Sequence, residues 1–132
     1  MNKPVLVTGV LFFFHGFMFC QNKLVSELKT YALCSCITNN YRAVDNTFNS
    51  KDITKAAIVQ INPISVETIE SLEKYVEDKT MDFYKGYNVY TGYDFSNPNM
   101  IIYNCTEFYK SKELRQYIRK LIKIKKSSGN NF

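Results

Sequence analysis

The spacing of hydrophobic residues is helical along most of the chain. Between Leu24 and Tyr41, apolar side chains recur every three or four positions, which places them on one face of a helix. Four later segments show the same spacing, so we expect about five helices in a single compact all-α domain. The predicted helices cover residues 24–41, 50–61, 65–84, 98–109 and 111–126.

Prolines and polar residues mark the ends of these helices. Pro63 disfavours the helical conformation of Asn62, so the second helix should end there. Ser65 suits the N-cap position of the third helix, and Pro98 suits the first turn of the fourth. Ser111 caps the fifth helix or kinks the chain before it. The residues expected to be buried in the third and fourth helices are Val66, Ile69, Leu72, Val76, Phe83, Ile101, Ile102, Cys105 and Phe108.

Residues 85–97 break the helical spacing. Their sequence, KGYNVYTGYDFSN, contains two glycines, two asparagines and three tyrosines. We expect an ordered loop in this stretch. A short hairpin is the alternative, but a single isolated hairpin is only marginally stable in water.

The first twenty residues, MNKPVLVTGVLFFFHGFMFC, have the pattern of a secretory signal peptide. A cation at Lys3 precedes an apolar run, and the stretch has no acidic residue. An uncleaved membrane anchor is the alternative, but the run falls short of the ~20 apolar residues that a spanning helix needs. We therefore assign residues 1–20 to a signal peptide and residues 21–132 to the exported domain.

Export and composition together restrict the chemistry of the mature domain. The only histidine, His15, lies in the predicted signal peptide, so the domain has no imidazole for a Cys-His or Ser-His pair. A hydrolase with paired carboxylates is left open, but the acids are spread along amphipathic helices without an apolar pocket to raise a pKa. The net charge of +5 is too mild to indicate nucleic acid. We predict a non-enzyme without cofactors.

The cysteines suggest one disulfide and no metal site. Cys34 and Cys36 are two positions apart and so point about 200° away from each other on a helix. A metal would need further ligands, and without histidine only Cys105 is left. Cys36 and Cys105 each lie on an apolar helix face of a protein exported to an oxidising compartment, so we predict that they pair. Two buried free thiols are the alternative, and Cys34 is expected at the edge of the core or in a dimer contact.

Two segments near the ends of the chain resemble a known family. The segments ALCSCITNNYR and IIYNCTEFYKSKELRQYIRKLI are similar to motifs of the amidase immunity proteins of type VI secretion, in the branch paired with the fourth amidase effector group. The chain departs from the family by the extra Cys34 and by Lys110, where the family often has histidine. The matching residues are Cys36, Ile37, Tyr41, Arg42, Cys105, Tyr109, Ser111, Lys112, Glu113, Leu114, Leu121 and Ile122.

The resemblance implies a periplasmic α-helical homodimer. Such a protein binds a papain-like peptidoglycan amidase, the effector, and blocks its Cys-His active-site cleft. It protects the producing cell and its siblings. It has no nucleic-acid partner and no stable membrane insertion once the signal peptide is removed.

Tyrosines of the irregular segment are the expected partner-binding residues. Tyrosine offers a large amphipathic surface with few rotatable bonds, which suits an inhibitory contact. We predict that residues 87–95 form the inhibitory loop, supported by Glu73 and Glu77 of the third helix. Alternatively, the tyrosines pack the loop onto its own domain. The loop residues in this prediction are Tyr87, Tyr90, Tyr93 and Asp94.

A rival interpretation is an exported helical binding or structural protein of the cell envelope. Four cations crowd the end of the fifth helix, where they complement the negative end of the helix dipole. In the rival interpretation they contact anionic envelope surfaces instead. These residues are Lys120, Lys123, Lys125 and Lys126.

Overall fold

The computed structural model describes residues 6–48, 51–85 and 99–128, and within these ranges it is helical without strands. The all-α prediction is therefore confirmed. The helices are α1 (Leu6–Val44), α2 (Thr54–Ile61), α3 (Val66–Thr80), α4 (Ile101–Lys110) and α5 (Lys112–Ser128).

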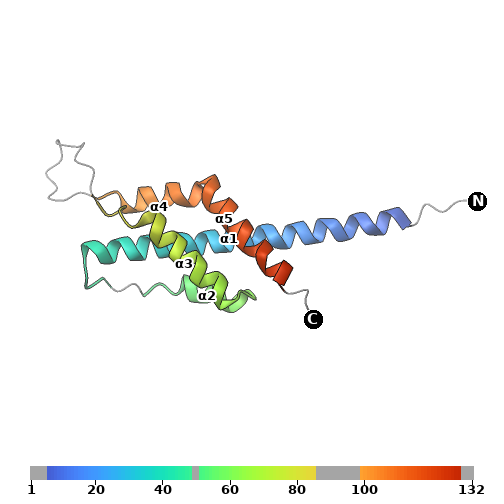
Figure 1. Cartoon of the computed structure of the whole chain (residues 1–132), viewed down its shortest axis with the longest axis horizontal. Coiled ribbons are helices and arrows are strands. Elements are labelled where there is room, and N and C mark those ends of the chain that lie inside the picture. Colours follow the sequence, from blue (N-terminus) through green and yellow to red (C-terminus); the bar gives the residue numbers. More distant parts are fainter. Residues whose placement is uncertain (1–5, 49–50, 86–98, 129–132) are drawn as a thin grey trace, which may run out of the picture.

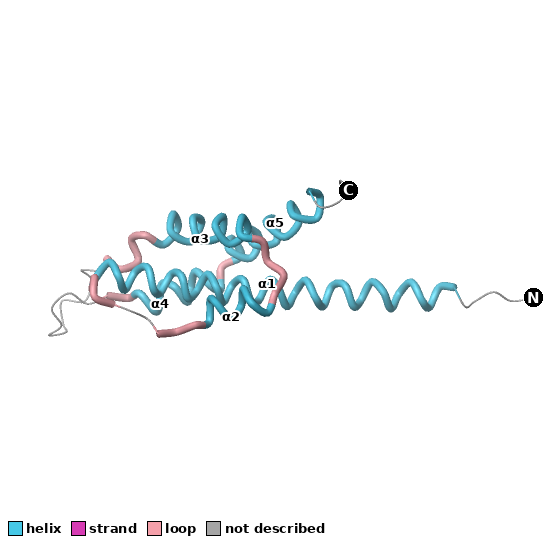
Figure 2. The backbone as a smooth tube through the Cα atoms, turned by 90° about the horizontal axis from the view of Figure 1, so that it is seen from below, coloured by secondary structure: helices cyan, strands magenta, loops and turns pink. Residues whose placement is uncertain are grey.

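Helix α1 is the axis of the molecule. It packs against each of the other four helices, which gather around its C-terminal half (Figure 1). Its N-terminal part extends away from them, and the perpendicular view in Figure 2 shows the same arrangement. No helix of the described residues is both long and apolar enough to span a membrane.

The core lies where α3, α4 and α5 meet α1, and α2 adds Ile58 to it. Among the described side chains, the buried ones begin at Val25, and Leu24 packs against them. Most of the core residues belong to the apolar helix faces that the hydrophobic spacing predicts. The hydrophobic residues with no exposed surface are Leu28, Ala32, Cys36, Leu72, Val76, Ile101, Cys105, Leu114 and Ile118.

Two residues predicted to be buried are instead exposed. The prediction for Ile102 was wrong because one helix position turns by about 100° and the adjacent Ile101 already faces the core; Ile102 is 52% exposed. Val66, which is 67% exposed, begins α3 and lies about 120° around that helix from the buried Leu72. The hydrophobic spacing predicted these helices correctly, but it assigned one exposed residue each to the buried faces of α3 and α4.

The helix boundaries agree with the turn residues in most places. Helix α2 ends at Ile61, before Asn62, as predicted. Ser65 precedes α3 in extended conformation, although its hydroxyl bonds the Thr68 side chain rather than the backbone. Ser111 caps α5, since its Oγ accepts a hydrogen bond from the Leu114 backbone N–H at 3.1 Å.

Several boundaries differ from the prediction. Helix α1 begins at Leu6 rather than near residue 24, and α2 begins at Thr54 rather than near residue 50. Helix α4 begins at Ile101, three positions after the predicted Pro98, and the Asn99 side chain accepts a hydrogen bond from the Ile101 N–H at 3.3 Å. An Asx turn at Asn99 thus replaces the proline start. Helix α3 ends at Thr80, and Phe83 reaches the core from the turn that follows.

Candidate functional site

The predicted disulfide between Cys36 and Cys105 is present. It joins α1 to α4 with a Cα–Cα distance of 5.8 Å, and both cysteines are fully buried. It closes a covalent loop across 69 positions of the chain. The packing of α1 against α4 therefore has a covalent bond at its centre.

Cys34 is a free, half-buried thiol. Burial raises its pKa, and the charge of Asp52 raises it further, with Lys55 acting in the opposite direction. A raised pKa leaves little of the reactive thiolate at neutral pH. The described residues also contain no group of three or more His, Cys, Asp or Glu side chains that could hold a metal ion.

Glu73, one of the predicted partner-binding acids, joins three helices. Its Oε1 accepts hydrogen bonds from the Tyr31 hydroxyl at 2.6 Å and the Ser35 hydroxyl at 3.3 Å, both on α1. The Lys55 ammonium of α2 lies 2.5 Å from the same oxygen and 4.9 Å from the centre of the Tyr31 ring. Burial alone would raise the pKa of Glu73, but the bonds from Lys55, Tyr31 and Ser35 outweigh it and lower the pKa.

The other predicted partner-binding residues fall into two groups. Glu77 lies exposed on α3, one turn before the helix ends. Tyr87, Tyr90, Tyr93 and Asp94 lie outside the described residues. The structure gives Glu73 an internal role, whereas the role of all six residues in binding a partner stays a prediction.

The chain on both sides of the predicted loop is attached to α4. Before the loop, Phe83 meets Phe108 edge to face, with ring centres 6.4 Å apart. The Asn104 side chain donates a hydrogen bond to the Phe83 carbonyl at 3.5 Å. After the loop, the Asn99 side chain accepts a hydrogen bond from the Ile101 backbone N–H at the start of α4. Both flanks are therefore held at the same end of the helical bundle.

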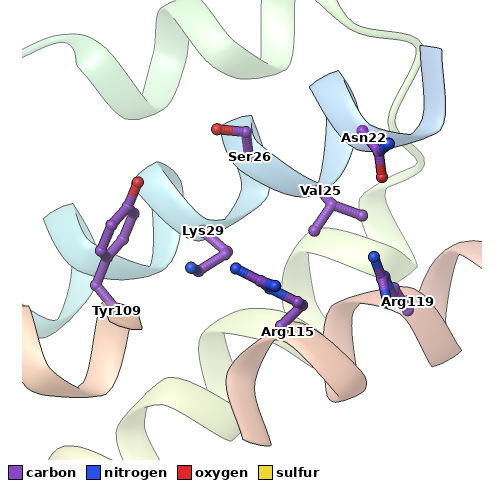
Figure 3. A pocket seen from close by; sticks show the side chains of 7 residues that line it. All are labelled: Asn22, Val25, Ser26, Lys29, Tyr109, Arg115 and Arg119. Carbon is purple, nitrogen blue, oxygen red and sulfur yellow. The ribbon is translucent and has the colours of Figure 1, made fainter. Parts of the chain in front are cut away.

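A cationic pocket of about 310 Å³ lies between α1, the end of α4 and α5 (Figure 3). Among the described residues that line it, three are cations and none is an acid. Figure 3 shows the ends of Lys29 and Arg115 turned towards each other, with Arg119 beside Asn22. The lining residues are Asn22, Val25, Ser26, Lys29, Tyr109, Arg115 and Arg119.

Lys29 is the unusual member of this pocket. Its side chain is only 7% exposed, and its Nζ lies 4.3 Å from the centre of the Tyr109 ring. The described residues offer it an aromatic face but no carboxylate. Burial lowers the pKa of Lys29, and the nearby charge of Arg115 lowers it further.

This pocket was not predicted from the sequence, in which the cations at the end of α5 are more conspicuous. A local signal exists, because Lys29 interrupts the apolar spacing of Val25, Leu28 and Ala32, and a lysine is rarely buried unless it is paired. Arg115 and Arg119 are four positions apart and so share a face of α5. Only the fold brings the two signals together.

The chain matches no protein-family model, no curated protein and no solved structure.

Proposed function

We propose that this chain is a periplasmic immunity protein that binds a peptidoglycan amidase effector of type VI secretion and occludes its Cys-His cleft. It acts as a homodimer without catalytic chemistry or cofactors. The chain's resemblance to amidase immunity proteins is the starting point of this proposal, and the position of the resembling segments supports it.

The observation that carries the proposal is the disulfide between the two resembling segments. Cys36 belongs to the first segment and Cys105 to the second, and their bond joins α1 to α4. Two further residues of the second segment are structural, since Ser111 caps α5 and Leu114 is fully buried. Residues of this kind would preserve the scaffold, while the binding surface is free to differ between effectors.

The disulfide also suits the proposed compartment. A disulfide persists where the surroundings are oxidising, as in the periplasm, and is rare in the cytosol. The signal-peptide pattern of residues 1–20 points to the same route. Both features are expected of a protein that meets its effector outside the inner membrane.

The proposed inhibitory loop, residues 87–95, lies in the chain between two described positions that bond to α4. Phe83 on one side and Asn99 on the other are both attached to α4. Fixing the ends of a binding segment reduces the conformational entropy that it loses in the complex. In the proposal, Glu77 adds negative charge near the start of this loop, and the tyrosines supply the buried contact area.

The proposal predicts that an adjacent open reading frame encodes a small Cys/His amidase, and the test uses that amidase. Cells that make that amidase in their periplasm should survive only when they also export this protein. The two proteins should co-purify and bind in calorimetry. A neighbour of that class that neither binds nor is neutralised would overturn the proposal.

The loop is tested separately by replacing Tyr90 and Tyr93 with alanine. The double variant should lose affinity for the amidase by at least about tenfold, because central tyrosines are often dominant contacts. Tyr103→Ala is the matched control, since Tyr103 is an exposed tyrosine of α4 outside the loop. Unchanged affinity of a folded Tyr90/Tyr93 double variant would remove the loop from the interface.

A second candidate function is an exported envelope protein that contacts anionic surfaces. The exposed cations of α5, which include Lys120 and Lys123, favour it. Binding of this kind should weaken sharply as salt rises, because exposed charges are screened. The affinity of a desolvated contact with an amidase should change much less as the salt concentration rises.

A further inference from the structure

The pocket between α1, α4 and α5 gathers positive charge without balancing it. Lys29 comes from α1, whereas Arg115 and Arg119 come from α5. Like charges held together repel, and no acidic side chain among the described lining residues offsets them. The lysine residue as a whole is only 7% exposed, so most of its side chain is packed against the protein. A bound anion would relieve the repulsion.

The donors of the pocket suit an oxyanion. An arginine guanidinium presents planar pairs of N–H groups that match the oxygens of a phosphate or carboxylate. The Asn22 amide lies on the α1 side, beside Arg119, and adds a neutral donor (Figure 3). Tyr109 closes the remaining side with its ring against the Lys29 ammonium. Cations thus approach the same space from two helices.

We propose that this pocket is a binding site for a phosphate-type oxyanion that carries two negative charges, held by Lys29, Arg115 and Arg119. Three cations suit a doubly charged group better than a single carboxylate. The volume of about 310 Å³ is at the lower end of the range for small-molecule sites, so the phosphate can be part of a small molecule or a lipid headgroup. The site is independent of the proposed amidase binding and is tested on the free protein.

The first experiment measures binding of inorganic phosphate to the full chain by calorimetry at pH 7 with ionic strength held constant by sodium chloride. Wild-type protein should bind phosphate saturably. Arg115→Gln and Arg119→Gln should each weaken binding by about tenfold or more, because each loses charge-assisted hydrogen bonds. Both arginines are exposed, so these variants should fold, and circular dichroism checks that they do.

Lys120→Gln is the matched control. Lys120 lies on the same helix and is exposed, and it is not part of the pocket lining. Its replacement removes the same charge and should leave phosphate affinity close to wild type. If Lys120→Gln and Arg115→Gln lowered the phosphate affinity equally, the effect would come from the overall charge of the protein, and the proposal would be overturned.

A further comparison tests the charge of the ligand and its source. Acetate should bind much more weakly than phosphate, and equal affinity would overturn the assignment of a doubly charged ligand.

Vesicles of phosphatidic acid in phosphatidylcholine distinguish a lipid headgroup from soluble phosphate. Vesicle binding that free phosphate displaces and Arg115→Gln weakens would identify the headgroup as a source. Phosphate binding without vesicle binding would identify a soluble ligand, and no saturable binding of phosphate would overturn the site.

Discussion

At the scale of single residues, the Glu73 carboxylate of α3 links its own helix to α1 and α2. One of its oxygens meets two hydroxyls of α1 and the Lys55 ammonium of α2. Hydrogen bonds to a charged group contribute more than those between neutral groups, and removing one partner leaves the others unsatisfied. The orientation of α1, α2 and α3 therefore depends on the charge of a single side chain.

Replacing Glu73 with glutamine should lower the free energy of unfolding at pH 7 by about 1 kcal/mol, because the carboxylate loses charge-assisted bonds but is 35% exposed and partly screened by water. The lowered pKa of Glu73 means that its contribution is complete above the ordinary carboxyl range. That contribution is lost as pH falls through the lowered pKa of the folded state. The difference between wild type and variant should therefore shrink below about pH 4. Urea unfolding across this pH range measures it.

Glu77→Gln is the control for this prediction, because Glu77 lies on the same helix but is exposed. Its stability should stay close to that of wild type. A Glu73→Gln variant that unfolds at the same urea concentration as wild type at pH 7 would show that the bonds to Glu73 do not contribute measurably to stability.

At the scale of elements, α4 depends on its neighbours. It has only 10 residues, and an isolated helix of that length is marginal in water. Ile101, Cys105 and Phe108 bury one face of it, and the disulfide fixes the middle of that face to α1. Its stability therefore comes from packing and from the covalent bond.

Replacing both Cys36 and Cys105 with alanine should lower the free energy of unfolding by up to about 4 kcal/mol, which is the chain-entropy expectation for a loop of 69 residues. Chemical denaturation of the oxidised protein and the double variant measures the difference. Cys34→Ala should have a small effect, because Cys34 is half-buried and unpaired among the described residues. Equal stability of the double variant and wild type would show that the bond does not constrain the unfolded chain as expected.

At the scale of the whole molecule, the packed domain uses only part of its longest helix. The described core runs from Val25 to Ile118, while the first part of α1 extends away from the other helices (Figure 2). The division of the chain into a signal peptide, residues 1–20, and an exported domain stays a prediction.

A chain that begins at Gln21 should fold cooperatively and form the Cys36–Cys105 bond. Its unfolding midpoint should lie close to that of the full chain, because the described core residues are all retained. A chain that instead ends before α5 should lose cooperative unfolding, since it lacks the buried Leu114 and Ile118. Calorimetry and non-reducing mass spectrometry compare the two truncations. Failure of the chain from Gln21 to fold would assign the N-terminal part of α1 to the domain.

The sequence predicted the elements well because helical spacing is a local property. The apolar positions of α1 and α5 and the stop before Pro63 need no knowledge of the fold. Cys36 and Cys105 were paired correctly because each lies within an apolar stripe. Burial was predicted less well for residues at the edge of an apolar helix face, such as Ile102, because their burial depends on which other helix covers that edge.

The candidate sites were harder to predict because they depend on long-range contacts. Glu73 was interpreted as a surface acid, but its partners Tyr31 and Lys55 come from two other helices. The pocket combines Lys29 with arginines from the opposite end of the chain. No local pattern indicates either combination.

The disulfide also determines how the protein would respond to mechanical load. A force applied between the two termini passes from α1 to α4 through the sulfur–sulfur bond, so the 69-residue loop that contains α2 and α3 bears no tension. At about 3.4 Å per residue, that loop withholds roughly 230 Å of extension until the bond is reduced. An oxidised molecule could therefore have α5 pulled away while α2 and α3 remain folded against α1.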